Sequence, residues 1–186
     1  MDLTEHCIHS DILAQGDLLT VKKDQIQLPN GRFSQREYVM HPGAVLIVPV
    51  LPNGNIVLER QFRYPLHQVF IELPAGKIDP GEEVLITGQR ELLEETGYTA
   101  SDWVKLGVQH PCIGYSNEVI HIFLAQNLTA GAHKRDEDEL LEVFDISLED
   151  CLRMVMQGEI TDSKTISGLF MAAEYLKQHG AVTDAA

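Results

Sequence analysis

The sequence predicts an α+β fold, in which a mixed sheet is flanked by helices and carries a strand-rich appendage at the N-terminus. From residue 43 onward, apolar runs of buried-strand length alternate with helix-like segments. The first 40 residues instead show short polar strands separated by turn residues. A length of 186 residues with 44% hydrophobic content suits one domain with an appendage.

The N-terminal segment, residues 1–40, is predicted as short strands joined by turns. Leu18–Val21, Asp24–Leu28 and Arg32–Val39 have strand composition, and Pro29-Asn30-Gly31 is a turn signal. The segment has too few large apolar residues to bury a core of its own. It must therefore pack on the main domain or on a second chain, and we expect a homodimer built through these strands.

The main domain, residues 41–180, is expected to open with a hairpin. Gly43–Val50 and Ile56–Arg63 are strand-like, and Pro52–Asn55 is a turn signal between them. Val69–Leu73 is a further strand.

The later elements continue the α+β pattern. The strands expected there are Trp103–Val108, Val119–Leu124 and Leu140–Ile146. The helices expected there are Leu148–Gln157 and Lys164–Gln178. The second helix carries an apolar stripe that we assign to the core, namely Leu169, Met171, Ala172 and Leu176. Residues 181–186 are expected to form a flexible tail.

The most informative stretch is residues 76–98, GKIDPGEEVLITGQRELLEETGY. At about 100° per residue, Glu91, Glu94 and Glu95 fall within an arc of about 100° on one helix face. Three carboxylates on one face repel each other, and no lysine is interspersed among them. Clustered hard oxygen ligands suit Mg²⁺ or Mn²⁺. For the triplet alone, a solvated acidic helix is the competing interpretation.

The surrounding spacing resembles the signature of the Nudix hydrolases, G-x5-E-x7-R-E-U-x-E-E-x-G-U, where U is a bulky aliphatic residue. The seven fixed residues that match are Gly76, Glu82, Arg90, Glu91, Glu94, Glu95 and Gly97. Tyr98 replaces the final aliphatic residue, and Gly88 stands in mid-helix at a cost of about 1 kcal/mol relative to Ala. The resemblance implies an α/β/α sandwich whose loop–helix–loop holds divalent metal ions against a pyrophosphate.

The resemblance also implies roles for individual residues. The metal ligands that it implies are the Ala75 carbonyl, Glu91, Glu95 and, from a later loop, Glu139. Glu94 supports catalysis in the same cluster. Arg90 is expected to point away from the acidic arc and to brace the loop by pairing with Glu82.

Two features outside the signature resemble the ADP-ribose pyrophosphatase branch of the family. Arg60–Pro65 is similar to the strand before the signature, whose last arginine, here Arg63, contacts substrate. The loop from Gly114 to Glu118 is similar to a substrate-binding loop, which implies that both of these residues contact substrate. Ile113 stands where the branch usually has proline, and this departure leaves the substrate open.

A late acidic run and the N-terminal strands complete the resemblance. Asp136–Glu139 is similar to a loop in which one glutamate, here Glu137, acts as base and another, here Glu139, reaches a metal ion. In the branch, residues of a partner chain line the nucleotide pocket. Arg36 and Glu37 stand where those contacts are made.

These features predict Mg²⁺-dependent hydrolysis of ADP-ribose to AMP and ribose 5-phosphate. The alternatives are hydrolysis of another nucleoside diphosphate sugar, such as GDP-mannose, and a ligand-sensing Nudix-like module without turnover. The retention of every carboxylate in the signature favours the enzyme. Which of the two phosphorus atoms the water attacks does not follow from the sequence.

Composition limits the partners and the compartment. The formal net charge of −14 argues against nucleic acid, which needs a basic surface. Three widely spaced cysteines are typical of reduced thiols and favour a cytoplasmic protein. No apolar run reaches the ~18 residues that a membrane span requires.

Overall fold

The chain divides into two compact units in a computed structural model that describes residues 1–131 and 140–179. Unit 1 comprises Met1–Gly43 and His110–Val119. Unit 2 comprises Ala44–Gln109 and the chain from Ile120 onward. Residues 181–186, predicted as a flexible tail, lie outside the described residues.

Strand β4 (Ala44–Pro49) is the centre of a mixed sheet in unit 2. Its residues are all apolar and all buried, so both of its faces and both of its edges must be covered. It pairs antiparallel with β7 (Ala75–Lys77) and parallel with β9 (Ile120–Ala130). Strand β8 (Tyr98–Gln109) extends the sheet beyond β9 in the antiparallel sense. The predicted mixed sheet is therefore confirmed.

The predicted hairpin between β4 and the next strand, β5 (Asn55–Arg63), is wrong. Strand β5 lies in a second sheet, between β10 (Leu141–Ser147) and β6 (Gln68–Glu72), and pairs antiparallel with both. The bridge between Val50 and Ile56 marks the point where the chain passes from one sheet to the other. The physical reason is that β7 and β9 already occupy both edges of β4, which leaves no edge for β5.

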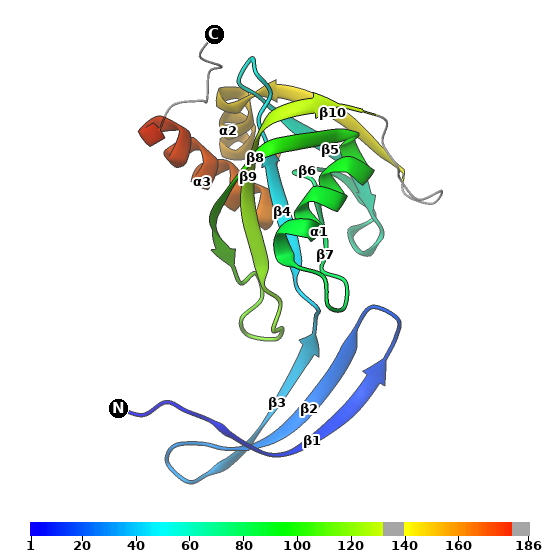
Figure 1. Cartoon of the computed structure of the whole chain (residues 1–186). Helices are drawn as coiled ribbons and strands as arrows, with labels where there is room; N and C mark the ends of the chain where they lie inside the picture. The colour runs from blue at the N-terminus through cyan, green and yellow to red at the C-terminus, as the bar shows by residue number, and fades with distance from the viewer. Residues whose placement is uncertain (132–139, 180–186) are drawn as a thin grey trace. The chain divides into compact units, whose positions relative to one another are not determined.

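Helices cover both faces of the mixed sheet (Figure 1). The helical segments are η1 (Tyr64–Leu66, 3₁₀), α1 (Val84–Glu91), η2 (Leu92–Thr96, π), α2 (Leu148–Gln157) and α3 (Ser163–His179). Val45 and Ile47 of β4 lie on the side of α1, whereas Leu46 and Val48 lie in the core with α2 and α3. This arrangement is the predicted α/β/α sandwich.

Close helix–sheet packing explains the glycine in the middle of α1. A Cβ atom on Gly88 would lie 3.2 Å from Cγ1 of Val45 and 3.4 Å from Cζ3 of Trp103. Gly88 lowers the helical propensity of α1, but the missing side chain lets α1 pack closely on the sheet. On α3 the predicted apolar stripe is confirmed, because Leu169 and Ala172 are fully buried in the opposite core.

Unit 1 contains an antiparallel sheet. Its strands are β1 (His6–Gln15), β2 (Thr20–Gln27) and β3 (Phe33–Met40). The sequence did not reveal β1, because this strand is exposed along its whole length and lacks an alternating pattern. Ile26 is buried in unit 1, whereas Ile8, Ile12 and Phe33 are more than half exposed.

The cysteines and the length of the helices bear on the expectations drawn from composition. Among these residues, Cys7, Cys112 and Cys151 are free thiols, and burial raises the pKa of Cys151 to about 12. No helix in the ranges 1–131 and 140–179 is long and apolar enough to cross a membrane.

Candidate active site

The segment that carries the carboxylates runs from β7 through a loop into α1 and ends in a π-helical turn. Glu91 is the last residue of α1, and Glu94 and Glu95 lie on η2. The prediction that the three glutamates share one α-helix is therefore wrong, because Glu94 and Glu95 belong to the π turn. Single π turns are frequent at functional sites, because they shift the direction of the side chains that follow. Gly97 ends the turn with φ +78°, as expected for a C-terminal glycine.

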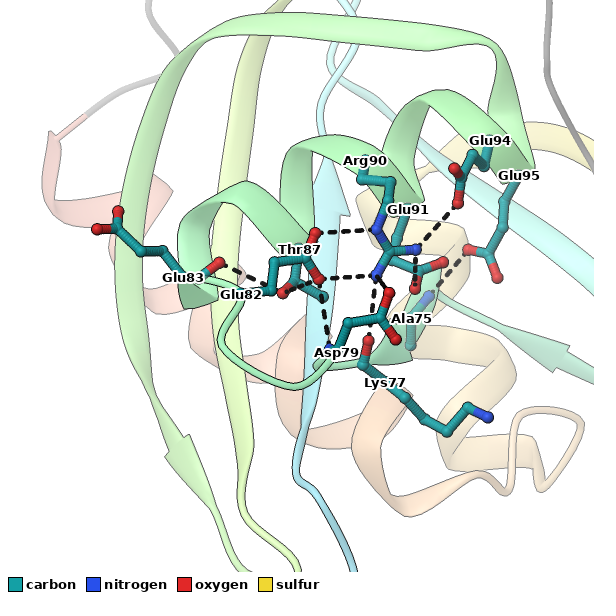
Figure 2. Close-up of polar contacts among 10 residues, drawn as sticks. All are labelled: Ala75, Lys77, Asp79, Glu82, Glu83, Thr87, Arg90, Glu91, Glu94 and Glu95. Atoms are coloured by element: carbon teal, nitrogen blue, oxygen red, sulfur yellow. Dashed lines mark hydrogen bonds and ion pairs between the residues drawn. The ribbon is translucent and has the colours of Figure 1, made fainter. Parts of the chain in front are cut away.

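Arg90 is the cationic centre of the acidic cluster (Figure 2). Its Nε and Nη2 atoms donate to the two carboxylate oxygens of Glu82, at 3.0 and 2.9 Å. Its Nη1 atom donates to Glu91 at 2.8 Å and to Glu94 at 3.0 Å. The predicted pairing with Glu82 is confirmed. The prediction that Arg90 points away from the acidic arc is wrong, because its long side chain turns back across the cluster.

The ion pairs of Arg90 shift the protonation equilibria of the cluster. Hydrogen bonding by Arg90 lowers the pKa of Glu82 from 4.5 to about 2. The same hydrogen bond from Glu82, together with the charge of Glu91, raises the pKa of Arg90. Glu82 is therefore a carboxylate, and Arg90 a cation, throughout the physiological range.

Thr87 is a residue of this cluster that the sequence analysis missed. Its side chain is fully buried, and its Oγ1 atom donates to Oε2 of Glu82 at 2.8 Å. The available signal was its position three residues before Arg90, which places both side chains on one helix face.

The carboxylates of Glu91 and Glu95 lie against the edge formed by Ala75 and Gly76. A Cβ atom on Gly76 would lie 1.9 Å from the carboxyl carbon of Glu91, so only glycine leaves room for that side chain. The amide of Ala75 donates to Oε2 of Glu95 at 3.1 Å, and Glu95 is 3% exposed. A strand edge and two carboxylates thus meet at one place.

This donor set is composed of oxygen atoms and fits a hard divalent cation. The space that Gly76 leaves brings the Glu91 carboxylate next to the backbone of β7. Within residues 1–131 and 140–179, no three acidic, histidine or cysteine side chains are already spaced to surround an ion. Arg90 instead binds oxygen atoms of Glu91 and Glu94.

Arg63, predicted to contact substrate, lies at the end of β5. Its Nε and Nη2 atoms donate to Glu72 at 2.7 and 2.8 Å, and Glu72 is 2% exposed. Burial raises the pKa of Glu72, but the hydrogen bonds of Arg63 and the charge of Lys164 outweigh it and lower that pKa overall. Arg63 itself is 40% exposed and borders a cavity of about 310 Å³. One face of its guanidinium is anchored, and the side chain still reaches open space.

The remaining described candidates lie in unit 1. Arg36, Glu37 and Gly114 border a hollow of about 530 Å³ within that unit. Arg36 donates to Glu5 through Nε at 3.0 Å. An oxygen of the Glu118 carboxylate lies 3.7 Å from Nδ1 of His41. Glu37 pairs with Lys23 at 3.0 Å. Glu137 and Glu139 lie outside the described residues.

Comparison with known proteins identifies the family and several relatives of this chain. The family model described as the NUDIX domain matches residues 40–166. The chain is 42% identical to the ADP-ribose pyrophosphatase of Bacillus subtilis (strain 168), over 88% of this chain and 89% of that protein. It is 35% identical to the methanol dehydrogenase activator of Bacillus methanolicus, over 93% of this chain and 92% of that protein.

A solved structure gives the same result for the fold. The crystal structure of an ADP compounds hydrolase superposes with a TM-score of 0.86 at 26% identity and covers 98% of this chain and 100% of that chain. The chain belongs to the Nudix hydrolase family. Nudix hydrolases in general use divalent metal ions, which is consistent with the oxygen donors gathered around Gly76.

Proposed function

We propose that this enzyme hydrolyses the pyrophosphate bond of ADP-ribose and releases AMP and ribose 5-phosphate, with Mg²⁺ as its cofactor. The observation that carries the proposal is the meeting of Glu91 and Glu95 with the Ala75–Gly76 edge. The substrate is suggested by the name of the Bacillus subtilis relative, which is similar over nearly the whole chain.

The metal would be held by the Ala75 carbonyl, Glu91, Glu95 and Glu139, with Glu94 in support. These are hard oxygen donors, and Mn²⁺ is expected to substitute for Mg²⁺ at such a site. A bound divalent ion neutralises phosphoryl oxygens and lowers the pKa of a coordinated water.

The protein's own groups would bind substrate and move the proton. Glu137 takes a proton from the attacking water, whose oxygen bonds to phosphorus as the bridging P–O bond breaks. Arg63, Gly114 and Glu118 contact the substrate. Arg90 keeps the carboxylates in place through its pairs with Glu82, Glu91 and Glu94, so its role is structural.

The N-terminal residues 1–40 would assemble two copies of the catalytic domain, residues 41–180. The exposed apolar side chains of unit 1, among them Ile8, Ile12 and Phe33, suit burial against a second copy. Arg36 and Glu37 would then contact the nucleotide bound by the neighbour. Such an enzyme, with reduced thiols and a strongly negative charge, fits the cytoplasm.

A substrate panel tests the proposal. The purified protein is incubated with ADP-ribose, GDP-mannose and other nucleoside diphosphate compounds, with Mg²⁺, with Mn²⁺ or with chelator, and products are resolved by chromatography. The fastest hydrolysis is expected with ADP-ribose, with AMP and ribose 5-phosphate in equal amounts. Faster cleavage of GDP-mannose would reassign the substrate. Tight binding of ADP-ribose without turnover under all conditions would indicate a sensing module.

A further inference from the structure

A buried polar cluster lies at the start of α3, where it contacts the end of β6. Thr165 is fully buried, and its Oγ1 atom accepts a hydrogen bond from the amide of Leu73 at 2.9 Å. The same hydroxyl donates to Oδ2 of Asp162 at 2.6 Å. Asp162 also accepts from the amide of Thr165 at 3.0 Å and from Lys164 at 2.9 Å. Lys164 in turn forms an ion pair with Glu72.

This cluster does more than end a loop and begin a helix. The bond from the Thr165 amide to Asp162 caps the helix by itself and needs neither Leu73 nor Glu72. A buried carboxylate such as Glu72 is costly unless it is fully paired. Yet Glu72 sits in an otherwise apolar strand end and is held by two cations, Arg63 and Lys164. The arrangement therefore fixes one geometry of the chain at residues 72–73.

The segment fixed in this way leads directly into the metal-binding edge. Leu73 is fully buried and packs so closely on α3 that a Cβ atom on Gly168 would lie 2.9 Å from its Cδ1 atom. The next residue, Pro74, accepts a hydrogen bond from Ile47 of β4 at 2.9 Å. Ala75 follows and donates to Glu95. Only Pro74 thus stands between Leu73, whose amide bonds Thr165, and Ala75, whose amide bonds Glu95.

We propose that Thr165, held by Asp162, is a positioning residue that sets the Ala75–Gly76 edge at the distance from Glu91 and Glu95 that metal binding requires. Lys164 supports the same placement through Glu72. The proposal rests on the proposed function for its catalytic consequence, whereas its structural part concerns only the edge and the two carboxylates. The start of α3 would thus position a site that is built from β7, α1 and η2.

Three variants of α3 test the proposal in the full-length protein. Thr165→Val keeps the shape of the side chain and removes the hydroxyl, and Thr165→Ser keeps the hydroxyl and removes a methyl group. Ser167→Ala is the matched control, because the Ser167 hydroxyl donates to Ser163 within α3 itself. Mn²⁺ binding is measured by electron paramagnetic resonance, and the exchange of the Ala75 amide hydrogen is measured by NMR well below the melting temperature.

The expected result is selective for the hydroxyl. Thr165→Val weakens Mn²⁺ binding by about tenfold, as losses of outer-shell support do, and accelerates exchange at Ala75. Thr165→Ser and Ser167→Ala keep the wild-type values of both. If Thr165→Val binds Mn²⁺ and protects the Ala75 amide like the wild type, the positioning role is refuted. A uniform rise of exchange over all of unit 2, with unchanged Mn²⁺ affinity, refutes it as well, because it indicates a general loss of stability.

Lys164→Met provides a second test, should Thr165→Val fail to fold. It leaves Arg63 paired with Glu72 and is expected to change Mn²⁺ affinity and Ala75 exchange in the same direction but less. Wild-type values of both would contradict the role given to Lys164 and Glu72. Neither Mn²⁺ affinity nor Ala75 exchange depends on substrate. A failure of the ADP-ribose assignment can therefore be told apart from a failure of the positioning role.

Discussion

The guanidinium of Arg90 and the carboxylate of Glu82 are joined by two hydrogen bonds, Nε to Oε1 at 3.0 Å and Nη2 to Oε2 at 2.9 Å. A pair joined in this way is geometrically specific as well as strong. It ties the loop after β7 to the last turn of α1, and the remaining nitrogen of Arg90 holds Glu91 and Glu94. The loop and the carboxylates are therefore placed by one side chain.

This pair predicts a stability change in acid. Because Arg90 lowers the pKa of Glu82 from 4.5 to about 2, the unfolded state binds a proton more readily than the folded state does. The stabilisation from Glu82 is fully present above pH 4.5 and is lost as the pH falls toward about 2. Urea unfolding with chelator should show that the wild type and Glu82→Gln differ most near pH 6 and converge only as the pH falls to about 2. A difference that stays constant over this range would contradict the assignment.

Substitution of Gly76 by alanine should damage the site without unfolding the protein. The new Cβ atom would overlap the Glu91 carboxylate, which lies 1.9 Å from its position, so the side chain must leave the edge of β7. We expect weaker Mn²⁺ binding and loss of most activity, with thermal unfolding close to that of the wild type. Gly16→Ala is the control, since its Cβ would have an ordinary contact at 3.9 Å. Full activity of Gly76→Ala would show that Glu91 does not need its present place.

Substitutions in the acidic run of residues 136–139 should distinguish the base from the metal ligand. Glu137→Gln is expected to lose about 10²–10⁴-fold in turnover, because a general base contributes on that scale. The Mg²⁺ concentration that gives half-maximal rate should stay at its wild-type value. Glu139→Gln is expected instead to raise the Mg²⁺ concentration needed for half-maximal rate. Steady-state rates over a Mg²⁺ titration measure both. An unimpaired Glu137→Gln would place the base elsewhere.

The N-terminal sheet should make a homodimer that activity requires. Ile12 is 59% exposed on β1, so Ile12→Asp places a charge on a surface that a second copy would bury. Light scattering should report a dimer for the wild type and a monomer for Ile12→Asp, with a parallel fall in activity. Gln35→Glu adds a charge at an exposed polar position of the same sheet and is expected to stay dimeric. A wild-type monomer with efficient ADP-ribose hydrolysis would refute both assembly and its role.

The sequence predicted those parts of the site that depend on local spacing. The helical period was enough to place Glu91, Glu94 and Glu95 near one another, whereas the pairing of Arg90 with Glu82 was expected from the resemblance to the Nudix signature. Contacts between distant segments carry no such periodic signal. Lys164 and Glu72 are 92 positions apart, and nothing in the sequence around either residue indicates that the two are in contact.

Strand pairing failed for the same reason. The apolar runs of β4 and β5, with a turn between them, have the local pattern of a hairpin. Only the occupation of both β4 edges by β7 and β9 decides otherwise, and this is a property of the whole sheet. The direction of Arg90 was missed because a helical wheel shows only where a side chain begins. The long side chain of Arg90 turns back toward Glu91 and Glu94, although the wheel places its Cα atom away from them.

The most direct test of the metal-dependent mechanism is the release of AMP from ADP-ribose over a Mg²⁺ titration, in the wild type, Glu91→Gln and Glu95→Gln. The wild type should release AMP and ribose 5-phosphate in equal amounts and lose all activity with chelator. Each variant should fall by roughly 100-fold or more, since it loses a direct ligand where outer-shell losses already reach 10–100-fold. Near-normal Mg²⁺-dependent rates in both variants would contradict the metal site.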